Sequence, residues 1–167
     1  MSSSQSHKIK SRDAPRDVFI TPIELAKLNI DMIDKREGEL WLDSCKNNGS
    51  YYNSFPPSVE KDYCEILEGI DFFDYEGSPD VIVQNPPYSN LDNWIKKNIE
   101  LEPRIISLLI GVNNLTTRRL EWLYNAGYGL TKMRMLKVWT WFGMSYILIF
   151  ERGKPSIMEF DRKVWRK

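Results

Sequence analysis

The chain has 167 residues, of which 42% are hydrophobic and 28% are charged, and its 23 basic side chains balance its 23 acidic ones. This length fits one domain with its own core, and an aromatic content of 13% argues against intrinsic disorder. The zero formal net charge excludes a globally basic nucleic-acid-binding protein, although a local basic patch remains compatible with it.

Two polar ends flank a single predicted domain. Residues 1–16 are predicted to form a flexible, mildly basic arm, residues 17–153 the folded domain, and residues 154–167 a basic tail. The arm lacks the apolar centre of a secretory signal, and no apolar run reaches the roughly 18 residues of a membrane span. We therefore expect no membrane association.

Cysteine and histidine usage narrows the chemistry. Cys45 and Cys64 form neither a disulfide framework nor a metal-ligand pair by their spacing. His7, the single histidine, lies in the polar arm, which argues against histidine-based catalysis. We therefore expect a protein of a reducing, intracellular (cytoplasmic) compartment without a metal site.

The first half of the domain begins with a helix. Thr21 as N-cap and Pro22 at the first helical position predict a helix over 23–33. The following runs predict, in order, a buried strand over 39–42, a loop with one helical turn over 44–58, two ambiguous segments over 63–67 and 70–73, and a β-branched strand over 80–84.

The second half continues the alternation of helix and strand. Its patterns predict a helix over 91–101, a strand buried on both faces over 105–112, a helix over 116–125 capped by Thr116 or Thr117, and paired strands over 133–142 and 145–150. This order predicts an α/β fold whose sheet is mostly parallel and ends in an antiparallel strand pair.

The tetrapeptide Asn85-Pro86-Pro87-Tyr88 directly follows the predicted strand over 80–84. Ligands of open α/β sheets bind beyond the carboxyl ends of the strands. The two prolines stiffen the backbone and remove two N–H donors, so carbonyls near them keep acceptor capacity. The Asn85 amide beside such a carbonyl suits a planar NH2 group, and Tyr88 offers a flat face to a heterocycle. The alternative is a rigid turn that only ends the strand.

The tetrapeptide resembles the catalytic motif of S-adenosylmethionine-dependent amino-methyltransferases, chiefly the adenine-N6 DNA methyltransferases. The resemblance implies that Asn85 and the Pro86 carbonyl accept hydrogen bonds from an exocyclic amine, while Tyr88 stacks on an extruded base. It further implies a Rossmann-like class I methyltransferase fold and methyl transfer to N6 of adenine in DNA. Direct transfer to nitrogen needs no protein nucleophile, so positioning and electrostatics supply the rate.

Further segments match the family's cofactor site in the family order. The loop from Asp43 to Tyr51 resembles one with an aspartate, two glycines and an aromatic residue, and Asn47 stands at the first glycine position. Asparagine is the non-glycine residue best able to adopt a left-handed conformation. The resemblance implies S-adenosyl-L-methionine as cofactor, bound by a methionine segment (Phe19, Thr21, Pro22), the loop (Asp43, Ser44, Cys45, Asn47, Gly49, Tyr51), a ribose acid (Glu65) and an adenine-reading pair (Asp71, Phe72).

Basic and aromatic side chains are interleaved late in the chain, which is a pattern that can follow a phosphate backbone and stack unpaired bases. The candidate nucleic-acid-binding residues are Arg118, Arg119, Lys132, Arg134, Lys137, Trp139 and Trp141. A strand pair that buries its tryptophans and exposes its lysines explains the same pattern equally well.

Other functions share these features. Cytosine N4, an RNA base and the amide of a protein glutamine also present a planar NH2 group, although the Phe-x-Thr-Pro segment favours DNA over RNA. The substitution at Asn47 also fits a catalytically inactive, methyltransferase-like binding module. Because little of the chain is left for a target-recognition domain, we expect relaxed specificity, or recognition supplied by a homodimer or a partner subunit.

Overall fold

The computed structural model describes residues 19–141, 143–162 and 164. The predicted flexible arm over 1–16 lies outside the described residues, and the predicted tail over 154–167 is described only in part. No helix in the described part of the chain has the length and apolar character needed to cross a membrane.

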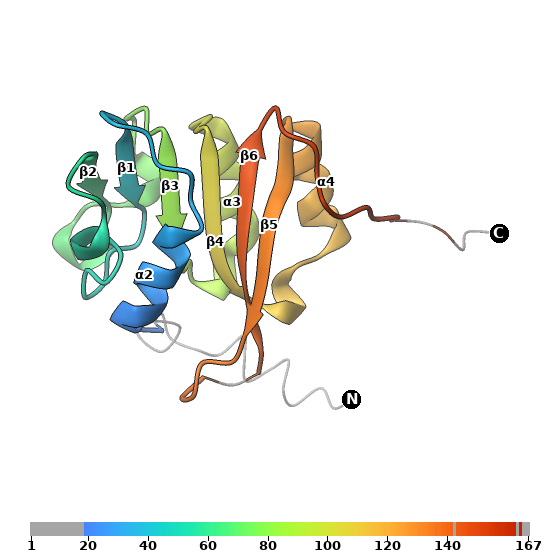
Figure 1. Cartoon of the computed structure of the whole chain (residues 1–167), viewed down its shortest axis with the longest axis horizontal. Helices are drawn as coiled ribbons and strands as arrows, with labels where there is room; N and C mark the ends of the chain where they lie inside the picture. The colour runs from blue at the N-terminus through green and yellow to red at the C-terminus, as the bar shows by residue number, and fades with distance from the viewer. Residues whose placement is uncertain (1–18, 142, 163, 165–167) are drawn as a thin grey trace.

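A six-stranded sheet with the strand order β2-β1-β3-β4-β6-β5 forms the centre of the molecule (Figure 1). Strands β2, β1, β3 and β4 are parallel, and β6 is antiparallel to both β4 and β5. The predicted mostly parallel sheet with a terminal antiparallel pair is therefore confirmed. The strands are β1 (Leu40–Asp43), β2 (Glu60–Tyr63), β3 (Val81–Gln84), β4 (Ile105–Gly111), β5 (Tyr128–Leu136) and β6 (Ser145–Arg152).

Helices cover both faces of this sheet. Helix α2 (Ile23–Asp31) lies in front of it in Figure 1, whereas α3 (Leu91–Glu100) and α4 (Thr117–Asn125) lie behind it. Strand β4 is buried on both faces. Ile105 and Leu109 pack in the hydrophobic cluster that contains residues of α2, and Ile106, Leu108 and Ile110 pack in the cluster that contains residues of α3 and α4. The unbroken apolar run that predicted this strand thus reflects a sheet covered on both sides.

The start of α2 differs from the prediction. Pro22, and not Thr21, takes the cap position, and no side chain caps the helix. The Thr21 hydroxyl instead accepts a hydrogen bond from Asn85 Nδ2. The assignment of Thr21 as N-cap was therefore wrong, because a tertiary contact uses the hydroxyl that a local cap would need. The helix also ends at Asp31, two residues before the predicted end.

Strand β2 was missed by the sequence prediction, which left residues 63–67 ambiguous. This strand lies at the edge of the sheet, and its first two residues, Glu60 and Lys61, are exposed. An edge strand with polar side chains lacks the apolar pattern by which buried strands are found.

The strand predicted over 133–142 lies earlier in the chain. It forms β5 over Tyr128–Leu136, so Trp139 and Trp141 belong to the connection 137–144 between β5 and β6. The alternation of basic and apolar residues continues past the true end of the strand, which moved the predicted boundary. Of the two possible caps of α4, Thr116 is the N-cap, and its hydroxyl accepts from the Arg119 N–H.

The strand register places the loops after β1 and β3 at the same end of the sheet as the tip of the β5–β6 hairpin. Asp43, Val83 and Ser107 form one row, which continues through Ile149 to Lys132. Strands β4, β6 and β5 extend beyond this row, so the hairpin projects past the ends of β1 and β3 (Figure 1). We call the side of the sheet where β1, β3 and β4 end the carboxyl edge.

Candidate active site

Asn85 follows β3 at the carboxyl edge and is half-buried. Its Nδ2 donates to the Phe19 carbonyl oxygen at 3.1 Å and to Thr21 Oγ1 at 3.2 Å. The segment before α2 thus fixes the orientation of the amide. Oδ1 accepts no hydrogen bond from the described residues, and the locked amide presents this oxygen as an acceptor.

The backbone of the tetrapeptide is fixed to the loop after β1. The Cys45 thiol lies 3.3 Å from the Asn85 carbonyl oxygen, and burial raises the pKa of this thiol, which keeps it protonated as a donor. The carbonyl of the buried Pro86 accepts no hydrogen bond from the described part of the chain. Two successive residues therefore offer acceptor oxygens, Asn85 Oδ1 and Pro86 O.

Three aromatic rings from distant segments form a wall next to this tetrapeptide. The Tyr88 hydroxyl accepts from the Gly111 N–H at 2.9 Å, which holds the half-buried ring against the end of β4. Phe19 stacks on Tyr88 with 5.9 Å between ring centroids, and it contacts the buried Trp141 at 5.7 Å. We call Phe19, Tyr88 and Trp141 the aromatic wall.

Asp43 organises the loop after β1. Its side chain is fully buried, and its carboxylate accepts from the N–H groups of Cys45 at 3.3 Å and Tyr52 at 3.1 Å. Desolvation outweighs these hydrogen bonds and raises the pKa of Asp43 to about 7. The aspartate predicted to bind the cofactor therefore also supports the fold of its own loop.

Two residues of this loop have positive φ angles. Asn47 has a φ of 50° and Gly49 a φ of 84°, so the predicted left-handed conformation of Asn47 is confirmed. A Cβ atom at Gly49 would lie 2.8 Å from Asn53 Nδ2. The φ of Gly49 disfavours any residue with a Cβ atom, and Asn47 adopts a positive φ with a residue type that tolerates it.

Glu65 joins this loop to the end of β2. Its carboxylate accepts from the Asn47 N–H at 2.6 Å and from the Leu67 N–H at 3.0 Å. Asp71 caps a short turn by accepting from the Phe73 N–H at 2.9 Å. Asp43 is thus the last residue of β1, and Glu65 and Asp71 lie in the segment after β2.

Two aromatic residues predicted at the cofactor site lie in the hydrophobic core. Tyr51 is 3% exposed, and its hydroxyl accepts from Asn29 Nδ2 at 2.9 Å. Phe72 is 2% exposed and stacks on Trp94 at 4.6 Å. The next residue, Phe73, is exposed. Sequence order alone did not reveal which of the two adjacent phenylalanines faces outward.

The sequence prediction also missed Gln84, the residue before the tetrapeptide. It is fully buried, and its Oε1 accepts from the Ser44 hydroxyl at 2.7 Å. Its Nε2 has no hydrogen-bond partner among the described residues. Glutamine at the end of an otherwise apolar strand was the available signal, because a buried amide needs partners for both of its ends.

The predicted nucleic-acid-binding residues fall into different environments. Arg118 and Arg119 both form ion pairs with Asp92, and Arg119 also donates to the Asn114 carbonyl oxygen. They lie at the start of α4, next to the carboxyl end of β4. Together with Asp92 they leave one uncompensated positive charge at this end of the sheet.

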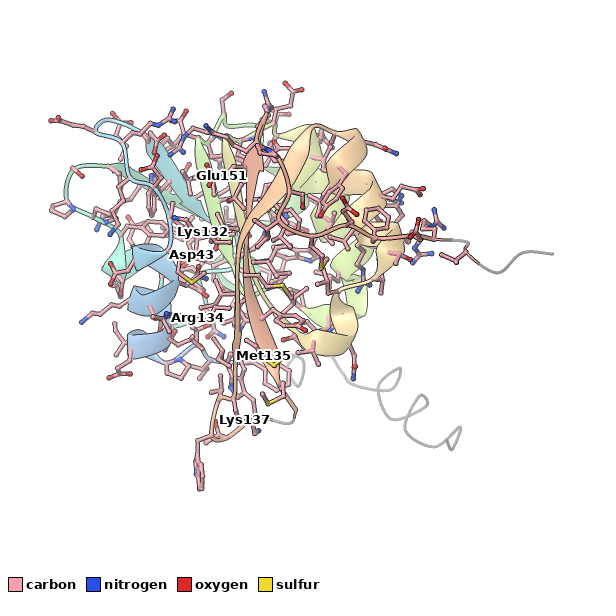
Figure 2. All side chains as sticks on the ribbon, turned by 45° about the vertical axis from the view of Figure 1, so that its right-hand side comes forward. Asp43, Lys132, Arg134, Met135, Lys137 and Glu151 are labelled. Atoms are coloured by element: carbon pink, nitrogen blue, oxygen red, sulfur yellow. The ribbon has the colours of Figure 1, made fainter. Side chains whose placement is uncertain are left out.

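Three basic side chains are spaced along β5 and into its connection with β6 (Figure 2). Lys132 and Arg134 lie in β5, and Lys137 is the first residue after it. The Lys132 ammonium donates to the Met32 carbonyl oxygen at 2.6 Å, and that of Lys137 donates to the Val138 and Trp141 carbonyl oxygens. Arg134 is exposed and has no hydrogen-bond or ion-pair partner within the described ranges. None of the three side chains forms an ion pair within the described ranges.

The two tryptophans of the connection 137–144 have opposite environments. Trp141 is buried in the aromatic wall, whereas Trp139 is 94% exposed. Burial of the tryptophan is therefore confirmed for Trp141 and not for Trp139, and nucleic-acid binding by Trp139 stays a prediction. A surface hollow of about 570 Å³ is lined by residues 73–78 and 100–102 and by Lys97, and it contains none of the predicted site residues.

Comparison with family models and with curated protein sequences finds no match. Solved structures with the same fold include precorrin-6y C5,15-methyltransferase from Geobacter metallireducens, with a TM-score of 0.59 and 15% identity over 80% of this chain and 89% of that one. A methyltransferase from Pyrococcus furiosus gives a TM-score of 0.57 and 17% identity over 81% of this chain and 85% of that one.

A third similar structure is the Mtq2–Trm112 complex of E. cuniculi, which methylates the translation termination factor eRF1. The matched chain of that complex gives a TM-score of 0.58 and 17% identity, over 83% of this chain and 99% of the matched chain. Together with the sheet order, these likenesses show that the chain has a Rossmann-like class I methyltransferase fold.

Proposed function

We propose that the protein transfers a methyl group from S-adenosyl-L-methionine to the exocyclic N6 amino group of adenine in DNA. The observation that carries this proposal is the locked amide of Asn85. Because the Phe19 carbonyl and Thr21 Oγ1 both accept from Nδ2, the amide oxygen is the group left to meet a substrate, and the Pro86 carbonyl follows directly in the chain.

The acidic side chains at the carboxyl edge fit the proposed cofactor. A ligand with a cationic centre, ribose hydroxyls and an adenine amine needs hydrogen-bond acceptors and negative charge. Asp43 and Glu65 follow β1 and β2, Asp71 follows Glu65, and the Gln84 amide adds an unused donor. When bound, S-adenosylmethionine supplies an electrophilic methyl group.

The site residues act on the methyl acceptor. Asn85 Oδ1 and the Pro86 carbonyl accept the two N–H groups of a planar amine and thereby orient its nitrogen. The nitrogen would bond to the methyl carbon as the methyl–sulfur bond breaks and a neutral thioether leaves, and it would release one N–H proton to water as it becomes positively charged. The two oxygens stabilise this developing charge, while the Tyr88 ring packs against the base. The site needs no protein nucleophile for this chemistry.

The tetrapeptide alone does not distinguish among planar amines, and the Phe-x-Thr-Pro segment is the feature that favours DNA as the substrate. The direct bonds from Asn85 to Phe19 and Thr21 support the view that these two motifs form one unit. Cytosine N4, an RNA base and protein glutamine present the same NH2 geometry, and an inactive binding module would keep the same fold. A second protomer or a partner subunit would supply target recognition.

The test is incubation of the purified chain with labelled S-adenosylmethionine and, in parallel, DNA, RNA or protein, followed by analysis of the modified nucleosides and residues. We expect N6-methyladenine in DNA. Labelled RNA or glutamine, or N4-methylcytosine, would contradict the proposed acceptor. A calorimetric titration without measurable binding of S-adenosylmethionine would instead indicate an inactive module.

Two variants test the role of the Asn85 amide. Asn85→Ala should lower methyl transfer at least about 100-fold with little change in the dissociation constant of S-adenosylmethionine, whereas undiminished turnover would refute the role of Asn85. Thr21→Val removes one of the two bonds that orient the amide, and it should lower turnover about five- to tenfold, as expected for about 1 kcal/mol. In the Asn85→Ala background it should have no further effect. Asn93→Ala, at an exposed asparagine of α3, is the matched control.

A further inference from the structure

The tip of the β5–β6 hairpin exposes large apolar side chains to solvent. Trp139 is 94% exposed, and Met135 and Met144 are 55% and 40% exposed. We call the described residues 135–141, 143 and 144 the hairpin tip. Scattered single apolar side chains on a surface are common, but an almost fully exposed tryptophan with two exposed methionines in the same short tip makes it a candidate contact surface.

The hairpin tip is held in place by its own contacts. The Trp141 N–H donates to the Val138 carbonyl oxygen at 3.0 Å, and the Lys137 ammonium donates to carbonyl oxygens of the same turn. On the side of β6, the Val112 N–H donates to the Met144 carbonyl oxygen at 3.0 Å. Trp139 therefore extends from an anchored turn and not from an unsupported loop.

The hairpin tip is also connected to the proposed amine-binding site. Trp141, two residues after Trp139, packs against Phe19, and Phe19 stacks on Tyr88 of the tetrapeptide. One aromatic wall thus supports both the hairpin and the site. The register places the hairpin beyond the row of Asp43, on the side where the tetrapeptide lies.

The charge of this region fits a polyanion. Residues 131–150 contain Lys132, Arg134 and Lys137 but no acidic side chain, although the whole chain has equal numbers of basic and acidic residues. These three residues line the path of β5 toward the tip (Figure 2). The two lysines donate to carbonyl oxygens, and none of the three basic residues forms an ion pair within the described residues. Asp34 and Glu151 line the same hollow as Lys132, so the positive charge lies chiefly at Arg134 and Lys137. Phosphates on both sides of a base pair would complement this charge.

We propose that Trp139 inserts into duplex DNA at the target base pair and occupies the stacking position that the extruded adenine leaves. An amine inside a base-paired duplex cannot reach Asn85 Oδ1, so the base must leave the stack. An indole ring stacks on any base, which makes insertion independent of sequence. Trp139 is then a positioning residue that makes duplex DNA a substrate. This inference rests on the proposed methylation of adenine.

The test compares three substrates that contain the same target adenine, at a site first identified by mapping methylation produced by the wild-type protein. In the first, the adenine is paired in a duplex; in the second, it faces an abasic position; in the third, it lies in a single strand. Trp139→Ala should lower methylation of the paired duplex about tenfold, equivalent to about 1.4 kcal/mol. It should change methylation of the other two substrates less than about twofold, because their bases are already unpaired.

A second measurement does not depend on methyl transfer. With 2-aminopurine in place of the paired target adenine, the wild-type protein should increase fluorescence as the base leaves the stack, and Trp139→Ala should not. Trp139→Phe keeps a ring that can stack, and it should restore most of both signals. Ile157→Ala, at an exposed apolar residue beside the first half of β5, should behave as wild type.

The outcomes separate this inference from the proposed function. If Trp139→Ala lost methylation equally on all three substrates, or lost none on the paired duplex, the insertion of Trp139 would be overturned. The proposed methylation of adenine would stand in both cases. If the wild-type protein methylated only the single-stranded substrate, the insertion of Trp139 would also be overturned, while adenine methylation would stand. A wild-type protein that methylates none of the three DNA substrates would overturn the proposed function, and the role of Trp139 with it.

Discussion

At the scale of single residues, burial and distant partners decide what each side chain does. Asp43 carries a carboxyl group that is fully buried, and its pKa rises to about 7 because desolvation outweighs two backbone hydrogen bonds. At neutral pH the group is thus close to its titration midpoint. The stability of the site loop therefore depends on pH in a range where other aspartates are ionised.

Asp43→Asn should remove a pH dependence of stability. Between about pH 4 and pH 7 the folded chain keeps a proton on Asp43 that the unfolded chain has lost. The free energy of unfolding should therefore fall as pH rises through this window, by up to about 4 kcal/mol, and stay level above it. Denaturant unfolding of wild type and Asp43→Asn at pH 5 and pH 8 measures this. From pH 5 to pH 8, the free energy of unfolding of wild type should fall relative to that of Asp43→Asn. A constant difference between the two proteins would contradict the raised pKa.

Other single residues show how a local pattern and a tertiary contact compete. Thr21 has the sequence context of a helix cap, but its hydroxyl accepts from Asn85, 64 residues later. Tyr51 and Phe72 occupy the predicted positions in the chain, yet both pack in the core. The sequence indicated where these residues lie along the chain but not which way their side chains point.

At the scale of elements, the loop after β1 keeps its shape through two left-handed residues. Asn47 is exposed, and its φ of 50° is a property of the backbone alone, since its side chain makes no hydrogen bond in the described structure. Its N–H donates to Glu65. The conformation of Asn47 therefore sets the link between the loop and the end of β2.

Two substitutions at Asn47 should have different effects. Alanine should destabilise the protein by about 1 kcal/mol, because alanine adopts the left-handed conformation less readily than asparagine does. Glycine should leave stability within about 0.5 kcal/mol of wild type and should preserve the binding of S-adenosylmethionine. Denaturant unfolding and calorimetric titration of both variants measure this. Equal stability of the two variants would show that the loop does not depend on the angle of Asn47.

The strands differ in how well the sequence predicted them. Strands β3 and β4 were found because both their faces are covered, which leaves a continuous apolar run. Strand β2 was missed because it is a polar edge strand that pairs only with β1. Prediction thus succeeded where both faces of a strand are buried and failed where an edge strand carries polar, partly exposed side chains.

At the scale of the whole molecule, a net charge of zero conceals an uneven distribution. Residues 131–150 contain only basic charged side chains, and Arg118 and Arg119 share one aspartate at the same end of the sheet. Arg134 has no partner among the described residues, whereas Arg119 is held by an ion pair and a carbonyl oxygen. Binding of DNA should therefore draw more on Arg134 than on Arg119.

Arg134→Ala should reduce the salt dependence of DNA binding. One lost phosphate contact lowers the slope of log K against log salt concentration by about 0.9. Arg119→Ala should mainly lower the free energy of unfolding, since it removes a structural ion pair. Arg36→Ala, at an exposed arginine outside the carboxyl edge, is the control and should leave the slope unchanged. Fluorescence anisotropy between 50 and 200 mM salt (about the range over which such slopes are resolved) measures this, and identical slopes for Arg134→Ala and wild type would contradict a phosphate contact.

The sequence by itself determined the alternation of strands and helices, the parallel sheet with its antiparallel end, the left-handed Asn47 and the position of the tetrapeptide after β3. These features depend on residues close together in the chain, whose periodicity and backbone preferences are visible locally. The tertiary structure decided that Thr21 and the Phe19 carbonyl orient Asn85, that Phe19, Tyr88 and Trp141 form one wall, and that Trp139 alone of its pair is exposed. These contacts join residues more than 50 positions apart, and only the packing of the sheet brings them together.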